Sequence, residues 1–230
     1  MNKSDQILCA WGGTFCAIAF GIGLFMAGFV PPPSPDLSAL EIASFYRSHP
    51  GMIRGGMVLG LLGMAGYVAF VGVISAQMWR MKTASKLPAL LQLGAGSIGV
   101  LTVMFPIMIF AAAAFRVERD PALTQMMNDL GWLIIIPAFP TFIAQFGAIA
   151  AGTLLDKSER PVFPRWAAYF NIWVTLLFLP GGFAYFFRTG PFAWDGFFDF
   201  WLAAGAFFAW LMVMTPLVLR AIGNDAGNGA

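Results

Sequence analysis

The stretch VPPPSPDLSALEIASFYRSHPGMIRGGM, residues 30–57, contains most of the signals that decide the fold. It separates two long apolar segments and includes prolines, charged residues and the only histidine of the chain, His49. Ser38 and Glu41 have the spacing of a helix capping box, whereas Pro50 disfavours helix at the residue before it. The stretch therefore predicts a short helix between two membrane spans, ending near His49.

The predicted short helix has two different faces. At about 100° per residue, Ile42, Phe45, Tyr46 and His49 share one face, and the opposite face is polar. We therefore expect an amphipathic helix at the membrane surface, with its aromatic side and His49 turned onto the protein.

The composition requires a lipid environment. Of the 230 residues, 59% are hydrophobic and only 10% are charged, whereas a soluble domain carries about 25% charged residues. The net charge of +2 and the lack of a Lys/Arg-rich run give no indication of nucleic-acid binding. Membrane lipids are therefore expected partners, and nucleic acid is not.

Six segments are apolar over the length of about 20 residues that a transmembrane helix needs. They are residues 7–30, 55–79, 88–115, 130–155, 166–187 and 197–219. The predicted fold class is an all-α integral membrane protein with one six-span domain, residues 1–220, and a short amphipathic helix between the first two spans. The polar tail, residues 221–230, is expected to be disordered.

Lysine and arginine predict the orientation. Eight of them fall on the side of the N-terminus and five on the other, so the positive-inside rule places both termini in the cytoplasm. The eight are Lys3, Arg80, Lys82, Lys86, Lys157, Arg160, Arg165 and Arg220, and the five are Arg47, Arg54, Arg116, Arg119 and Arg188. We expect a bacterial inner (cytoplasmic) membrane protein, with Trp132, Trp194 and Trp201 in the aromatic belt of its outer boundary.

The middles of the spans carry no Asp, Glu, Lys, Arg or His, and their deepest polar side chains are Thr102, Thr141, Gln145 and Thr175. Ion-coupled carriers normally bury ionisable residues at mid-membrane. This pattern argues against a pump, an ion-coupled carrier or a channel for charged substrates. A structural metal site is not expected either, because the chain has no Cys/His cluster.

Glycines and prolines predict where helices pack closely and where they break. The second and third spans are glycine-rich, which favours close helix packing, either within the chain or at a dimer interface. Prolines interrupt the backbone hydrogen bonds of a helix and kink or break it. Those inside the predicted spans are Pro106, Pro137, Pro140, Pro180 and Pro216.

The candidate ligand-binding residues, Tyr46, His49, Arg54, Arg188 and Asp195, all fall on the predicted outer face. The charges there are interpreted either as structural arginine–carboxylate pairs at helix ends or as a polar rim above an aromatic pocket. The run YFFRTGPFAWDGFFDFW, residues 185–201, could line such a pocket or face lipid.

His49 has three interpretations. It could be a hydrogen-bonded structural residue, a general acid/base and hence the candidate catalytic residue, or an axial ligand of haem b. No metal ligand other than this haem alternative is expected.

Three segments carry a resemblance to a broad family of uncharacterised bacterial six-helix membrane proteins. They are SPDLSALEIASFYRSHPGMIRGG (residues 34–56), SAQMWRM (residues 75–81) and RPVFPRWAAYFNIW (residues 160–173). This resemblance implies the same six-helix fold and brings no activity with it.

A second, local resemblance concerns His49 and the following GMIRGGM, residues 51–57. This part is similar to styrene oxide isomerase, an oligomeric membrane enzyme in which histidine-held haem b acts as a Lewis acid on an epoxide. The resemblance implies haem b as a cofactor and His49 as its ligand.

Three hypotheses for the function follow. The first is a protein that binds a hydrophobic or lipid-like small molecule at its outer face. The second is a membrane enzyme, haem b-dependent or acid/base and isomerase-like, that acts on a small lipophilic substrate through His49. The third is an accessory subunit, with a homo-oligomer or a membrane complex as its partner.

Overall fold

The computed structural model describes residues 2–226, and over that range it contains helices and no strand. The first elements are α1 (Lys3–Met26), α2 (Ala39–Ser48), α3 (Pro50–Trp79) and α4 (Leu87–Ala113). They are followed by α5 (Pro121–Ile135), α6 (Phe139–Leu155), α7 (Arg165–Phe178), the 3-10 helix η1 (Leu179–Tyr185), the π-helix η2 (Phe197–Leu202) and α8 (Ala203–Ala226).

Six helical segments are long and apolar enough to cross a membrane, which confirms the predicted fold class. They are α1, α3, α4, α5 with α6, α7 with η1, and η2 with α8. The fourth segment begins at Pro121, not at residue 130. Residues 221–226, which we expected to be disordered, continue α8, and Ala221 and Ile222 are buried. Residues 227–230 of the expected tail lie outside the described residues.

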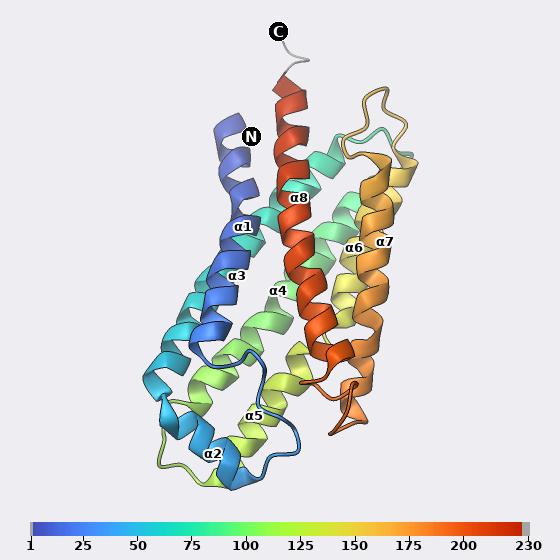
Figure 1. Cartoon of the computed structure of the whole chain (residues 1–230). Helices are drawn as coiled ribbons and strands as arrows, with labels where there is room; N and C mark the ends of the chain where they lie inside the picture. Colours follow the sequence, from blue (N-terminus) through green and yellow to red (C-terminus); the bar gives the residue numbers. More distant parts are fainter. Residues whose placement is uncertain (1, 227–230) are drawn as a thin grey trace.

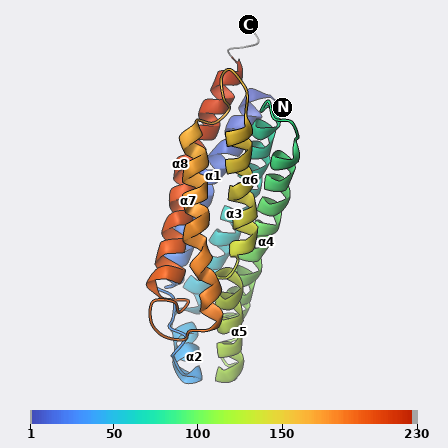
Figure 2. The same cartoon turned by 90° about the vertical axis from the view of Figure 1, so that its right-hand side faces the viewer.

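The spans form an elongated bundle (Figures 1 and 2). α1 packs on α3 and α8, α3 on α4, α4 on α6, α6 on α7, and α7 on α8, so the spans close a ring in chain order. The start of α1 and the end of α8 lie together at one end of the bundle, called the terminal end below. α2 lies beside the start of α5 at the opposite end, called the α2 end.

The interface between α1 and α3 is the most extensive in the bundle, because glycines allow the two backbones to approach closely. A Cβ atom on Gly12 would collide with the carbonyl oxygen of Gly66, and one on Gly23 with that of Gly56. Close packing of this kind stabilises helix pairs in lipid, where the hydrophobic effect does not drive helices together. These glycines therefore serve the packing of helices within the chain.

α2 is amphipathic, as predicted, and its apolar face holds it to the bundle. The Ser38–Glu41 capping box is present, and the Ser38 amide donates to Oε2 of Glu41 at 2.8 Å. Ile42 and Tyr46 are buried. His49 is exposed, so the prediction that it lies on the buried face is wrong. The physical reason is the backbone, because ψ of 56° at His49 leaves the helical register before α3 begins at Pro50.

Two of the predicted proline positions break their spans, whereas others do not. Pro137 falls between α5 and α6, and Pro180 falls in η1. Pro106 and Pro216 lie inside the continuous helices α4 and α8. Pro140 takes one of the first positions of α6, where a missing amide hydrogen costs no helical hydrogen bond.

Replacing Gly12 with alanine should destabilise the protein by about 1–3 kcal/mol, because the added methyl group forces α1 away from the Gly66 carbonyl. Gly94→Ala in α4 is the matched control, since a Cβ there meets nothing within 4 Å. Thermal unfolding in detergent micelles measures both variants. Equal melting temperatures for the two would contradict the α1–α3 packing.

Candidate functional site

Tyr46, the first of the predicted site residues, is buried and joins α2 to α5. Its hydroxyl donates to Oδ1 of Asn128 at 3.2 Å. Its ring packs edge-on against Phe29, which packs in turn on Trp132. Burial raises the pKa of the Tyr46 phenol above its ordinary value, and the charge of Asp129 adds to the effect. Tyr46 is therefore a neutral structural donor in this position.

Arg188 and Asp195 come from the segment between η1 and η2. Nη2 of Arg188 donates to the carbonyl oxygen of Pro35 at 3.1 Å, and Nε1 of Trp194 donates to that of Pro33 at 2.8 Å. Asp195, the next residue, is half-buried. This segment consequently fixes the proline-rich loop between α1 and α2.

His49 and Arg54 lie at the start of α3 and are exposed. Nδ1 of His49 is 3.1 Å from Oγ of Ser48, and Nε of Arg54 donates to the carbonyl oxygen of Pro50 at 3.2 Å. Over residues 2–226, no hydrogen bond or ion pair directly joins any two of the five predicted site residues.

Arginines at the α2 end bond to backbone carbonyls. Arg47 donates to the carbonyl oxygens of Val117 at 2.7 Å and Arg119 at 3.1 Å. In the described part of the chain the one side-chain ion pair, Arg80–Asp225 at 2.8 Å, lies at the terminal end. The prediction of arginine–carboxylate pairs at the α2 end is therefore wrong. The guanidinium groups instead satisfy carbonyl groups of loops and helix ends, which lack intrahelical donors.

An apolar cavity of about 80 Å³ lies inside the bundle. α1 contributes Phe20 and Leu24 to its wall, and α8 contributes Ala204 and Phe207. Its further aromatic rings belong to Trp132, Phe142, Phe178, Phe200 and Phe208. Of the described residues that line it, Asp199 is the only one with an ionisable side chain.

Three spans depart from α-helix beside this cavity. Ile136 lies in the break between α5 and α6, Phe178 ends α7 before η1, and Asp199 lies in η2. Gly181 allows η1 to pack on the break, because a Cβ there would lie 2.8 Å from the carbonyl oxygen of Ile136. Non-helical backbone at membrane depth occurs where protein buries it or where it lines a cavity. These departures from α-helix therefore identify the cavity as the candidate site.

Asp199 is fully buried, with 0% of its surface exposed. Neither carboxylate oxygen has a hydrogen-bond partner among the described residues. The amide of Ala184 in η1 approaches the carboxyl group without completing a hydrogen bond of normal geometry. Because a charge removed from water costs several kcal/mol when it is unpaired, this carboxyl group either stays protonated or needs a partner for its charge. Its sequence position, at the start of a span, gave no sign of this burial.

Trp132 contributes a second polar atom without a partner. Its Nε1 is buried and has no hydrogen-bond acceptor in the described structure, while its ring packs on Phe110 and Phe200. Trp132 and Trp194 are 1% and 4% exposed, so the prediction that they lie in an aromatic belt is wrong. Their rings face inward because loops and helix breaks at the α2 end pack on them. Trp201, at 47%, is exposed as expected.

Several other buried polar side chains in the spans pair within the chain, although Nε2 of Gln92 and Nε2 of Gln145 also lack a partner among the described residues. The Tyr67 hydroxyl donates to Oε1 of Gln145 at 2.9 Å, and Nε1 of Trp210 donates to Oδ1 of Asn171 at 2.8 Å. Sequence reasoning identified Gln145 as deep but missed Asn171, whose helix face could not be assigned. Asp199 and Trp132 differ in that both carry unpartnered polar atoms and both line the apolar cavity. A few polar groups among apolar walls are typical of small-molecule sites.

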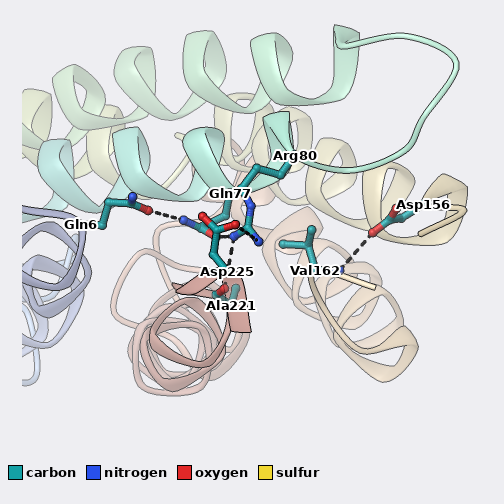
Figure 3. Close-up of polar contacts among 7 residues, drawn as sticks. All are labelled: Gln6, Gln77, Arg80, Asp156, Val162, Ala221 and Asp225. Atoms are coloured by element: carbon teal, nitrogen blue, oxygen red, sulfur yellow. Dashed lines mark hydrogen bonds and ion pairs between the residues drawn. The ribbon is translucent and has the colours of Figure 1, made fainter. Parts of the chain in front are cut away.

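The terminal end holds a polar network of a structural kind (Figure 3). Gln77 of α3 donates to Gln6 of α1, and Arg80 donates to Gln77. Arg80 also donates to the Ala221 carbonyl oxygen at 3.2 Å and pairs with Asp225 of α8. The network ties three spans together at the predicted cytoplasmic side.

Asp156, also drawn in Figure 3, joins the two loops at this end. Its Oδ1 accepts from the amides of Lys82 and Ser158, both at 3.0 Å, and its Oδ2 accepts from the amide of Val162 at 3.1 Å. Partial burial raises the pKa of Asp156, but the hydrogen bonds from these three residues outweigh burial, so its pKa lies below the ordinary 3.8.

Comparison with known proteins adds no relative. No family model matches the chain, and no curated protein or solved structure matches it.

Asp156→Asn should lower the melting temperature at neutral pH, because an amide accepts these hydrogen bonds less well than a carboxylate. A carboxylate whose pKa is lower in the folded protein than in the unfolded chain stabilises the fold at pH values above its unfolded pKa. This stability is lost as the pH falls through the folded pKa. The melting temperature of the wild type should therefore fall more steeply below about pH 4 than that of Asp156→Asn. Glu159→Gln, at an exposed acid of the same loop, should follow the wild type. Parallel curves for all three proteins would contradict the role of Asp156.

Proposed function

We propose that this multi-pass membrane protein binds a small lipophilic molecule in the cavity lined by α1, α5, α6, η2 and α8. The observation that carries the proposal is the combination of apolar walls with unpartnered polar atoms on Asp199 and Trp132. Ligand pockets are typically lined by hydrophobic and aromatic side chains, with a few polar groups that orient the ligand.

The residues selected from the sequence take supporting positions in this proposal. Tyr46 reaches the cavity wall through Phe29 and Trp132, and Arg188 fixes the proline-rich loop at the same end. His49, Arg54 and Asp195 belong to the polar rim of the α2 end. The distribution of lysine and arginine favours placing this end on the outer face of a bacterial inner membrane.

The alternatives find less support. The ring of His49 is exposed and contacts Ser48, which does not favour a catalytic group or a haem b ligand over a structural residue. Glycines that could meet the helix of a partner subunit, such as Gly23 and Gly56, pack against each other within the chain. Of the three hypotheses, the binding of a small lipophilic molecule is the one that the cavity supports.

Indane, a small neutral hydrocarbon, is a suitable probe for the cavity. Saturation-transfer NMR with the full chain in zwitterionic micelles should detect indane binding above the level of empty micelles. Ala204→Phe should weaken this binding at least tenfold, because the new ring occupies the cavity. Met212→Phe, on an exposed position of the same helix that does not line the cavity, is the control and should bind normally. Binding that is equal in both variants, or no binding in the wild type, would reject the proposed function.

A further inference from the structure

We infer that the ligand of this cavity is a lipophilic amine, held by an ion pair between its ammonium group and the Asp199 carboxylate. The inference rests on the proposed function and names the chemical class of the molecule. It follows from the charge that the cavity holds, the aromatic groups around that charge, and the local backbone.

Among the described residues, none provides a counter-charge to the carboxyl group of Asp199. No lysine, arginine or histidine is found among the described residues that line the cavity. Of the arginines at the α2 end, Arg188 bonds to the carbonyl oxygen of Pro35 and Arg47 to those of Val117 and Arg119. A buried carboxylate is normally paired or hydrogen-bonded. An ammonium group on the ligand would supply the missing partner.

The backbone around Asp199 offers partial positive charge to its carboxyl group. Asp199 lies in the first turn of η2, where the partial positive charge of a helix N-terminus stabilises an anion. Phe200 and Trp201 both direct their amides to the carbonyl oxygen of Gly196, at 3.0 and 3.4 Å, in the widened π-helical turn. This turn places Asp199, Phe200 and Ala203 together on the cavity wall. Turns of this type are frequent at functional sites.

The aromatic wall suits a cation as well as a hydrocarbon. Phe20, Phe142, Phe178, Phe207 and Trp132 line the same space as Asp199. The face of an aromatic ring attracts an ammonium group electrostatically, and the attraction grows when water is excluded. The carbon skeleton of the ligand would fill the remainder of the apolar space. The Nε1–H of Trp132 remains available to an acceptor atom, such as a hydroxyl group beside the amine.

A matched pair of probes separates this inference from the proposed function. 2-Aminoindane is indane with one added amino group, which is protonated at pH 7. Saturation-transfer NMR with the full chain should show at least tenfold tighter binding of 2-aminoindane than of indane, each corrected for uptake by empty micelles. The neutral N-acetyl derivative should lose this advantage in the wild-type protein.

Asp199→Asn keeps the shape of the side chain and removes its charge. We expect this variant to bind 2-aminoindane at least tenfold more weakly and to bind indane as before. Asp36→Asn, at an exposed acid of the proline-rich loop that does not line the cavity, should behave like the wild type.

Each outcome bears on one of the two proposals. If indane binds but the amine and its N-acetyl derivative bind equally, the inference is wrong and the proposed function stands. The same conclusion holds if Asp199→Asn leaves amine binding unchanged, which would indicate a protonated or water-filled site. If neither indane nor the amine binds to the wild type, both proposals fail. Should Asp199→Asn not fold, the comparison of the amine with its N-acetyl derivative in the wild type still decides.

Discussion

A lipid bilayer contains no water in its core, so polar groups inside it must find their partners within the protein. This constraint explains most of the backbone conformation and most of the polar contacts of the chain. Its backbone is helical through most of each span, and many of its deep amides and hydroxyls pair within the protein, as Tyr67 does with Gln145 and Trp210 with Asn171. Among the described residues, Nε2 of Gln92 and of Gln145 lack a partner, and so do Nε1 of Trp132 and the carboxyl group of Asp199, which line an apolar cavity.

Close helix packing and helix breaks occur on different sides of the bundle, and the cavity lies beside the breaks. On one side of the bundle, α1 and α3 meet through glycines with almost no space between their backbones. On the other side, prolines and glycines end α-helical geometry at the α5–α6 junction and in η1. Gly181 lets these irregular segments pack on each other at the level of the cavity. The proline-rich loop and α2 then cover the same end of the bundle (Figure 1).

Local signals were sufficient to predict much of the fold. The apolar lengths predicted the spans, and the spacing of Ser38 and Glu41 predicted the start of α2. His49 was misplaced because the helical periodicity was extended through a residue whose backbone leaves the helix before Pro50. Asp199 and Trp132 lie near span starts in the sequence, where charged and aromatic side chains usually face water or lipid headgroups. Their inward direction depends on η1, η2 and α5 packing together, which hydropathy does not report.

The central claim is that the buried carboxylate of Asp199 receives the charge of a bound amine. Infrared difference spectroscopy of the full chain, recorded before and after adding 2-aminoindane, observes this carboxylate directly. The account predicts a shift of a carboxylate stretching band that is present in the wild type and in Asp36→Asn and is missing in Asp199→Asn. A spectrum with no carboxylate change, or the same change in Asp199→Asn, would contradict it.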